Sequence, residues 1–371
     1  MTPGIDPDFN RLASLIWTHP AIGRVREVAT DPVFLVGGAI RDGLADFEVD
    51  DIDLVVEGDP VPLAAGLDPE AQVNDRFGTV NLRIDGMPVD IATARTETYS
   101  RPGALPEVKP GLLRDDLVRR DFTINAMAIG IEEDSELIDP FGGIADLRSG
   151  VLRILHDGSF EDDPTRALRA ARYAARLGFD LEPKTAELLM KTNLGAVSLE
   201  RVENELGLIA SEDNALEALR LARVWGLVDF DEERLDLADL AIGLIEVEPW
   251  KGEVERRDLI LVAIFGDLPG EELLVEPPDA WAGHLLARNR SPIELILARA
   301  SGATWLDRWQ EKWRWVELEI TGADLLAAGV PEGPAIGDGL DAALEAKLNR
   351  GASGAVAELA VALKATGSRQ S

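Results

Sequence analysis

The first part of the chain carries short apolar runs of the kind that form strands. An apolar run at residues 34–36 precedes a glycine pair and a polar stretch, and a second run follows at residues 51–56. Residues 76–84 and 87–93 place apolar side chains on both sides of Asp85-Gly86, a strong signal for a β-hairpin. We therefore predict four strands here, two of which form a hairpin.

Helical spacing dominates the remainder of the chain. Asp163-Pro164 predicts a helix start, with an acidic N-cap and proline at the first helical position, and this helix is expected to end near Gly178. A lead-in helix is predicted over residues 8–28. Further helices are predicted at residues 184–191, 199–211, 214–225, 235–247, 257–265, 279–287, 292–300 and 305–318, with two more after Pro334. The plan is a head of strands and helices followed by an all-helical remainder.

Two segments separate these patterns. Residues 95–115 are rich in proline, glycine and charge and show no clear period, so we expect a mobile functional loop. Gly142-Gly143 is expected to form a turn before the helical part.

Composition describes a globular protein with more than one domain. The 371 residues are 46% hydrophobic and 28% charged, which fits roughly two to four small domains. No apolar run reaches the roughly eighteen residues of a membrane span, so we expect no membrane-spanning helix. The amino terminus lacks the pattern of a secretory signal, so we do not expect secretion. The absence of cysteine excludes disulfides, thiolate metal sites and cysteine nucleophiles, and it fits the cytoplasm.

Charge and histidine content narrow the kinds of partner. The net charge of −31 argues against a surface that binds nucleic acid as a whole, since phosphates are bound by clustered lysine and arginine. Net charge is an average, however, and a local basic groove is compatible with it. The three histidines, His19, His156 and His284, are too scattered for a histidine metal cluster.

Two motifs near the first strands carry candidate chemistry. At Gly37-Gly38, backbone N–H groups can approach a phosphate closely, and Arg41 can meet the same anion. Asp51 and Asp53 are two apart on a predicted strand, so both carboxylates point to one face and suit a divalent cation such as Mg²⁺. The simpler interpretations are a plain turn and a solvated strand end.

The hairpin and the block after it supply further polar groups. Asp90 lies on the second hairpin strand, where a third carboxylate beside the pair is geometrically plausible. In RRDFTINAMA, Asp121 and Asn125 are four apart, and on a helix they would share a face and bond ribose hydroxyls while an arginine meets phosphate. A capped helix start with surface charges is an equally good interpretation.

The helix after Asp163 is rich in arginine. Arg166, Arg169, Arg172 and Arg176 share one sector, which offers an anion-facing stripe in an acidic chain. Asp163 and Arg166 also present acceptors and donors in a pattern that can match the Watson–Crick edge of a base. The simpler interpretation is an N-cap aspartate followed by a solvated arginine.

Taken together and in order, these motifs resemble the signature of the polymerase-beta-like nucleotidyltransferases. The likeness is greatest to the class II tRNA nucleotidyltransferase (CCA-adding enzyme) and poly(A) polymerase family, and it covers roughly residues 33–206. It implies an α+β fold, with a nucleotidyltransferase head built on a mixed or antiparallel sheet and an all-α neck, body and tail. The implied domains are residues 1–145 (head), 146–207 (neck), 208–285 (body) and 286–371 (tail).

The resemblance also implies a role for each motif. Its catalytic residues would be Asp51, Asp53 and Asp90, with two Mg²⁺ ions held by Asp51 and Asp53; Gly37, Gly38 and Arg41 would bind the triphosphate, Asp121, Asn125 and Arg120 the ribose, and Asp163, Arg166 and Arg169 the base. Arg201 and Glu203, in the weakest motif, would support the base-reading helix, and Gly142-Gly143 would be a hinge.

The implied reaction is nucleotidyl transfer from CTP or ATP to the 3′-hydroxyl of tRNA, building or completing CCA. In the family a shortened loop at residues 95–115 accompanies CC-only activity, and the loop here is not short, which favours CCA or A addition. Addition of A alone, addition of CC alone and poly(A) synthesis remain open alternatives.

Two other classes of protein remain open as well. A small-molecule nucleotidyltransferase of the antibiotic-modifying type would share the glycine pair and the aspartates, but it leaves RRDFTINAMA and the arginine helix unexplained. A non-catalytic RNA-binding protein with the same fold would not need intact carboxylates.

Overall fold

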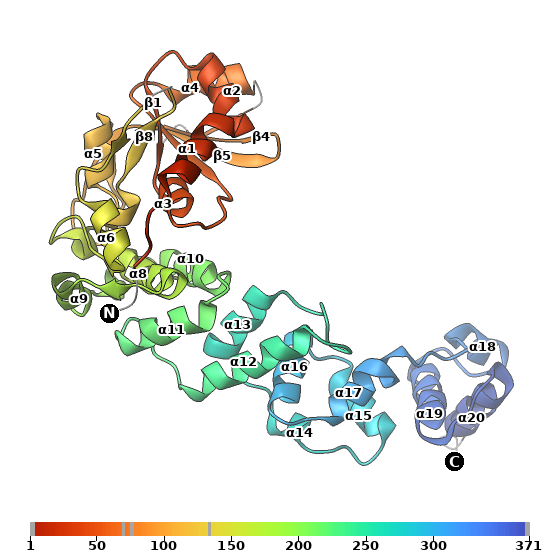
Figure 1. Ribbon diagram of the computed structural model, residues 1–371. Coiled ribbons are helices and arrows are strands. Elements are labelled where there is room, and N and C mark those ends of the chain that lie inside the picture. Colours follow the sequence, from red (N-terminus) through yellow and green to blue (C-terminus); the bar gives the residue numbers. More distant parts are fainter. Residues whose placement is uncertain (1–3, 69–70, 75–77, 133–134, 368–371) are drawn as a thin grey trace. The chain divides into compact units, whose positions relative to one another are not determined.

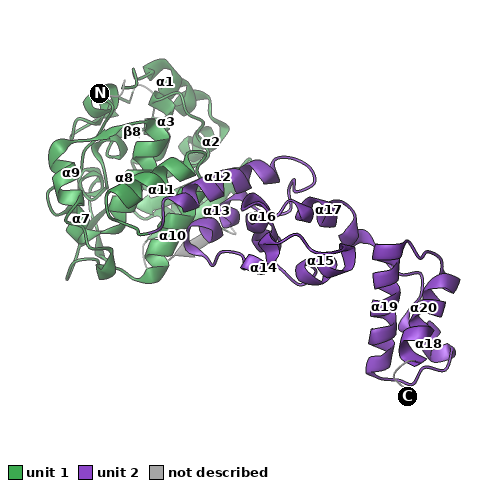
Figure 2. Ribbon diagram, turned by 90° about the horizontal axis from the view of Figure 1, so that it is seen from below, with its two compact units in different colours: residues 1–229 green, residues 230–371 purple. Residues whose placement is uncertain are grey.

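The structure, a computed structural model, describes residues 4–68, 71–74, 78–132 and 135–367 (Figure 1). It divides into two compact units, residues 1–229 and 230–371 (Figure 2). The first unit contains a mixed sheet with helices around it, and the second consists of helices. The predicted α+β fold is confirmed.

The apolar runs of the first unit form one sheet. Its seven described strands follow the order β3-β4-β5-β2-β1-β8-β9. At its centre β1 (Val33–Val36) pairs antiparallel with β2 (Ile52–Val56), and β2 pairs parallel with β5 (Met87–Thr93). The other strands, all antiparallel to their neighbours, are β3 (Gln72–Asn74), β4 (Thr79–Ile84), β8 (Ala128–Gly130) and β9 (Leu137–Ile138).

The predicted hairpin is confirmed. Strands β4 and β5 are joined by Asp85 and Gly86, whose φ angles of 52° and 87° match a turn with both central residues in the left-handed region. Residues 76 and 77, where the first strand was expected to begin, lie outside the described residues. The turn fixes the register of β4 and β5, and the separate pairing of β2 with β5 sets Asp90 directly opposite Asp53.

One core joins the sheet to the helix that carries the arginines. Ile52 and Leu54 of β2 are buried with Ile91 of β5, and the same cluster reaches Ala167 and Ala170 of α8 (Thr165–Leu177). Burial of these apolar side chains is the main term that fixes α8 against the strands. The predicted head and the first helices of the predicted neck therefore share a core, and the four domain boundaries stay a prediction.

The lead-in segment is two helices and not the single helix that we predicted. Helix α1 (Phe9–Thr18) ends before His19, and α2 (Pro20–Val28) begins at Pro20. A residue before proline is disfavoured in the helical region, and His19 accordingly is extended, with ψ 122°. Its side chain accepts a hydrogen bond from the backbone N–H of Ala21 and so caps α2.

Residues 95–115 contain regular secondary structure that the sequence did not predict, and the mobility of this segment stays a prediction. Strands β6 (Arg95–Thr98) and β7 (Glu107–Pro110) form an antiparallel ribbon, and α5 (Leu113–Val118) follows. The sequences of β6 and β7 are polar and lack the alternation of apolar residues that predicts a strand, since neither face of the ribbon packs on an apolar core. Instead the nearly buried Glu97 carboxylate accepts hydrogen bonds from Arg95, Tyr99 and Arg119.

Three further helices of the first unit lie close to their predicted positions. They are α9 (Pro183–Leu189), α10 (Leu199–Ala210) and α11 (Ala215–Val224). The sequence did not predict the short helices α4 (Pro60–Leu67) and α7 (Ser159–Asp162). Helix α6 (Gly143–Ser149) begins after Gly142, whose φ of 81° requires the left-handed region that glycine adopts readily. A turn at this glycine pair is confirmed, and its role as a hinge stays a prediction.

The second unit is all helical, as predicted. Its longer helices are α12 (Glu233–Ile245), α13 (Arg256–Phe265), α15 (Ala280–Ala287), α16 (Pro292–Ala300), α17 (Trp305–Glu311), α19 (Pro334–Arg350) and α20 (Ala355–Gly367). Helix α17 ends earlier than predicted, and a 3-10 turn at Trp313–Trp315 follows it. The sequence did not predict two short helices, α14 (Glu271–Leu274) and α18 (Gly322–Ala327). Every helix in the described residues is too short or too polar to cross a membrane.

Candidate active site

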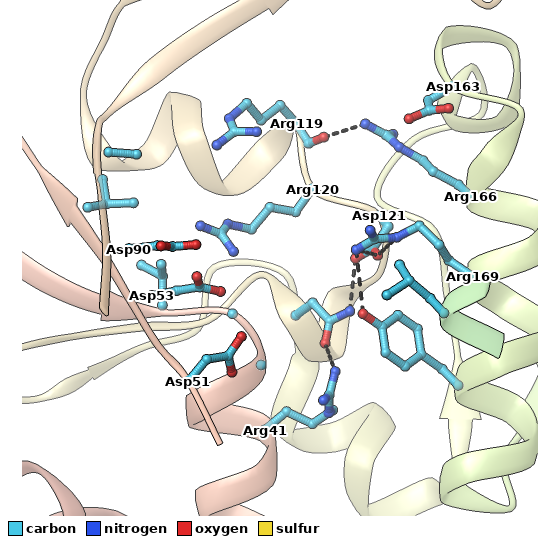
Figure 3. Close-up of a pocket in the computed structure, with 18 of the residues that line it drawn as sticks. Arg41, Asp51, Asp53, Asp90, Arg119, Arg120, Asp121, Asp163, Arg166 and Arg169 are labelled. Atoms are coloured by element: carbon cyan, nitrogen blue, oxygen red, sulfur yellow. Dashed lines mark hydrogen bonds and ion pairs between the residues drawn. The ribbon is translucent and has the colours of Figure 1, made fainter. Parts of the chain in front are cut away.

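A pocket of about 700 Å³ opens within the first unit (Figure 3). Its walls come from the start of β2, from β5, from the glycine turn after β1, and from α8 and α10. Every residue that the sequence indicated for catalysis, triphosphate, ribose or base lines this pocket. The fold therefore gathers motifs that are more than a hundred positions apart in the chain.

Three aspartates occupy one side of the pocket. Asp53 lies on β2 and is paired in register with Asp90 on the parallel strand β5. Asp51 comes just before β2, so the strand begins one residue later than predicted, and the intervening Ile52 is buried as expected. Asn81 on β4 donates a hydrogen bond of 2.5 Å to Asp90. Asp90 is thus held by a neighbour, whereas no described residue donates a hydrogen bond or ion pair to Asp51 or Asp53.

The electrostatics of this corner fit a bound cation. Burial, and next the charge of Asp51, raises the pKa of Asp53 to about 6, although Arg120 opposes the shift. The pKa of Asp51 is also raised, by burial and then by Asp90. In the described part of the chain no three acidic or histidine side chains form a complete metal cage. Mg²⁺ commonly binds through one or two carboxylates plus substrate phosphates and water, so this donor set fits it.

The glycine turn borders the same corner. Gly37 has φ +70°, and a Cβ placed on it would lie 2.7 Å from Nη1 of Arg120 and 3.5 Å from Oδ2 of Asp53. The positive φ strains any other residue, and a Cβ would also crowd the Arg120 guanidinium, so this position favours glycine. Gly38 begins α3 (Gly38–Leu44). Both glycines line the pocket, and neither carries a side chain that would keep a ligand away from the backbone of this turn.

Arg41 is less free than the sequence suggested. It is 3% exposed, and its guanidinium donates to both oxygens of Asp42 at 2.8 and 2.7 Å and to Oδ1 of Asn125 at 2.7 Å. Its guanidinium carbon also lies 4.8 Å from the ring centre of Tyr173. Arg41 thus forms part of the pocket wall and orients Asn125, and its contact with a triphosphate stays a prediction.

The side chains of Asp121 and Asn125 contact each other, but the two residues do not lie on one helix, which was the arrangement that their spacing suggested. Asn125 ends a 3-10 turn (Thr123–Asn125), and its Nδ2 donates to Oδ1 of Asp121 at 2.9 Å. Arg169 donates from Nε to the other Asp121 oxygen at 2.8 Å. Burial opposes the charge, yet Arg169 and the bond from Asn125 hold the pKa of Asp121 well below its usual range. These hydrogen-bonded residues form a polar wall of the pocket, across from the three aspartates (Figure 3).

At the start of α8 the side chains form a second polar cluster. The Oδ1 atom of Asp163 caps the helix by accepting from the backbone N–H of Thr165 at 3.0 Å, and Nη2 of Arg201 reaches the same oxygen at 2.7 Å. Helix α8 itself begins at Thr165, slightly later than predicted. Arg166 is 6% exposed and donates to Oγ of Ser159 at 2.7 Å and to the carbonyl of Arg119 at 2.5 Å.

The arginine stripe of α8 faces the pocket, but its charge is largely balanced. Arg172 pairs with Glu212 at 3.2 Å, and Arg176 pairs with Asp42 at 3.2 Å. Sequence spacing places four arginines in one sector, but it does not reveal carboxylates that approach from α3 and from the end of α10. The pocket is consequently less basic than the stripe alone suggests.

Sequence reasoning missed two further carboxylates that pair with arginines of the site, Glu205 and Asp116. Glu203 is exposed, whereas Glu205 points inward, with Oε1 3.6 Å from Nη1 of Arg169. Burial raises the pKa of Glu205. A signal was present, because Glu205 is four residues after Arg201 on α10 and so shares its face, while Glu203 does not. Asp116 was missed too, although it precedes Arg119 and Arg120 by three and four residues on and just after α5.

Comparison with known proteins identifies the family. Residues 33–153 match the poly A polymerase head domain. A CC-adding tRNA nucleotidyltransferase of Deinococcus radiodurans is 32% identical over 326 residues, which cover 82% of each chain. An A-adding tRNA nucleotidyltransferase of Aquifex aeolicus is 47% identical over 206 residues, or 53% of this chain.

The overall fold is shared with solved structures. The complex of a CCA-adding enzyme with ATP superimposes with a TM-score of 0.79 at 26% identity, covering 98% of this chain and 99% of the other. The chain spans a quarter of the length of the Aquifex relative and about half the length of two further A-adding relatives. The match over 82% of the Deinococcus protein, together with the head-domain match and the common fold, shows that this chain belongs to the class II tRNA nucleotidyltransferase family.

Proposed function

We propose that this protein is a metal-dependent nucleotidyltransferase that adds CCA to the 3′ end of tRNA from CTP and ATP. The observation that carries the proposal is the pocket of the first unit. There, Asp51 and Asp53, which accept no hydrogen bond and form no ion pair with a described residue, lie opposite the polar wall that contains Asp121 and Asn125. The names of the relatives, which act on tRNA or bind ATP, support the choice of substrates.

In this proposal Asp51 and Asp53 hold Mg²⁺, and Asp90 lies beside them on the side of the attacking hydroxyl. The ions supply charge stabilisation for the triphosphate and for the leaving pyrophosphate. Gly37 and Gly38 contribute backbone N–H groups to the phosphates because no Cβ blocks their approach. We place the ribose against Asp121 and Asn125, whose mutual hydrogen bond fixes the direction of both side chains.

Base recognition is assigned to Asp163, Arg166 and Arg169. Oδ1 of Asp163 is occupied by Thr165 and Arg201, whereas Oδ2 accepts no hydrogen bond from a described residue. One carboxylate oxygen thus remains for an exocyclic amine, a group that cytosine and adenine have and uracil lacks. Arg166 is held in place by Ser159 and by the carbonyl of Arg119, which preorganises its guanidinium.

Removal of Arg201 is expected to weaken selection among nucleotides. Arg201→Ala leaves Oδ1 of Asp163 held by Thr165 alone, so the carboxylate is less firmly oriented and the ratio of kcat/KM for CTP over UTP should fall by roughly tenfold. Glu203→Ala is the matched control, because Glu203 is exposed on the same helix. Steady-state kinetics with each nucleotide measures the ratios. An unchanged ratio in Arg201→Ala would show that Asp163 is not oriented by this contact.

The pKa of Asp53 predicts a pH dependence of metal binding. A carboxylate must be ionised to bind a cation, and the pKa of Asp53 is raised to about 6 by burial and Asp51. Affinity for Mn²⁺ in the absence of nucleotide should therefore be nearly constant above pH 7 and decline steadily below pH 6. Titrations by electron paramagnetic resonance at several pH values test this. In Asp53→Asn the decline near pH 6 should disappear along with most of the binding.

Addition of A alone is the second candidate. The observation in its favour is the 47% identity to the A-adding Aquifex protein over 206 residues, compared with 32% over 326 residues for the CC-adding relative.

We also propose the division into head, neck, body and tail at residues 145, 207 and 285.

The test of the reaction class is its dependence on an RNA hydroxyl. Release of pyrophosphate from CTP and ATP should require Mg²⁺ and a tRNA with a free 3′-hydroxyl, and it should stop when the tRNA ends in a 3′-deoxynucleotide. Release that instead requires a small hydroxylated acceptor such as an aminoglycoside would overturn the proposal. RNA binding without any release would also overturn it.

A further inference from the structure

Asp116 is a buried carboxylate that none of the assignments above uses. It lies on α5 and is 0% exposed. Its Oδ1 accepts hydrogen bonds from Nε and Nη2 of Arg119 at 2.9 and 2.6 Å, and its Oδ2 accepts from Nη2 and Nε of Arg120 at 2.9 and 3.3 Å. Burial opposes the charge, yet Arg120 and Arg119 keep the pKa of Asp116 below its usual value. One ionised carboxylate thus serves two arginines, one with each oxygen.

The two arginines differ in what else holds them. Arg119 has a second carboxylate, because its Nη1 donates to Glu97 at 3.0 Å. Within the described residues, Asp116 is the one carboxylate at ion-pair distance from Arg120. If Asp116 lost its charge, Arg119 would keep an anchor, and Arg120 would keep none.

The side chain of Arg120 points toward Asp53 and Asp90 (Figure 3). Its Nη1 lies 2.7 Å from the point where Gly37 would carry a Cβ, and Oδ2 of Asp53 lies 3.5 Å from that same point. The two side chains therefore face each other across the space that Gly37 leaves empty. In the described structure no ion pair joins them. A released Arg120 needs only a small side-chain rotation to donate to Asp53, and a charge-assisted bond of that kind is favourable.

We propose that Asp116 is a positioning residue that holds Arg120 back from Asp53 and so keeps the Asp53 carboxylate available to a divalent cation. The proposal rests on the proposed function, which assigns Asp53 to the metal. Asp116 acts at a distance, through Arg120, and touches neither the metal nor the nucleotide. Without it, Arg120 becomes an internal competitor for the metal site.

Metal binding by the full-length protein without nucleotide tests the proposal. Free Mn²⁺ is measured by electron paramagnetic resonance at pH 7.5 in the wild type, Asp116→Asn, Asp116→Asn/Arg120→Met and Asp116→Asn/Arg119→Met. We expect Asp116→Asn to raise the Kd for Mn²⁺ roughly fivefold, the scale of one partly exposed ion pair. Adding Arg120→Met should restore wild-type affinity, whereas adding Arg119→Met should not. Thermal melts of each variant report on folding.

Each outcome decides the matter. Unchanged affinity in Asp116→Asn overturns the proposal, and so does weak affinity that Arg120→Met leaves weak, since Asp116 would then act on local folding. If Asp116→Asn does not fold, Asp116→Glu keeps the charge but places it one methylene further from the backbone, so we expect a smaller loss of Mn²⁺ affinity that Arg120→Met again removes. Unchanged affinity in Asp116→Glu would then overturn the proposal. The proposed function fails separately if the wild type binds no Mn²⁺ or if Asp53→Ala binds it equally well.

Discussion

Asp53→Ala is expected to lower kcat for nucleotide addition to tRNA by about a thousandfold or more, because metal ions contribute several kcal/mol to such transition states. Asp53 lies on a central strand, opposite Asp90, and has no bonded partner among the described residues. Its removal would delete the proposed metal ligand without breaking a hydrogen bond or ion pair to a described residue. Burial raises the pKa of Asp53, so its ionised form destabilises the folded state at neutral pH. The melting temperature of Asp53→Ala should therefore equal or exceed that of the wild type.

Asp50→Ala is the matched control for this variant. Asp50 is exposed and lies three residues before Asp53. Single-turnover addition of a nucleotide to tRNA should proceed within about threefold of the wild-type rate in Asp50→Ala. Comparable activity in Asp53→Ala and the wild type would contradict the metal assignment of this aspartate.

Asp121→Asn should have the second largest effect, and chiefly on stability. The Asp121 carboxylate is 5% exposed and receives hydrogen bonds from Asn125, Arg169 and the backbone N–H of Phe122. Breaking a buried charge pair from one side typically costs about 3 kcal/mol. We therefore expect a lower free energy of unfolding at pH 7 in urea denaturation. We also expect a higher KM for nucleotides, because the side chain of Asn125 loses its partner.

The pH dependence separates this effect from a general loss of packing. The folded pKa of Asp121 lies well below its unfolded value, so its stabilising contribution is fully present above about pH 4 and is lost as the pH falls further. The difference between wild type and Asp121→Asn should therefore shrink as the pH falls from about 4 to 2.5. Glu187→Gln, which breaks an exposed pair with Lys191, should show no such difference. A gap that is independent of pH would contradict the assigned ion pair.

Much of the first unit could be predicted because its signals are local. The turn at Asp85-Gly86 sets the register of β4 and β5 by its own backbone geometry, and the apolar positions around Asp53 indicate a buried strand. The parallel pairing of β2 with β5 is a contact between distant parts of the chain. The sequence made that pairing plausible, and only the folded sheet places Asp90 opposite Asp53.

The parts that sequence did not predict depend on partners that lie far away in the chain. The ribbon at residues 95–110 has no apolar alternation, since its polar strands are held by Glu97 and its bonds to Arg95 and Arg119. Likewise Arg176 looks free along α8, but Asp42, which is 134 positions away, pairs with it. Ion pairs between distant residues do not produce a periodic pattern in the sequence. The sequence therefore predicted a more basic pocket than the structure has.

One assay tests the central claim most directly. Purified protein with Mg²⁺ is offered tRNA that ends before CCA, after the first C, or after CC, with CTP and ATP separately and together. We expect all three tRNAs to be extended to CCA when both nucleotides are present, and each addition to be lost in Asp53→Ala. Extension of the CC-ended tRNA alone would contradict CCA addition in favour of A addition. Extension of none would contradict the proposed reaction.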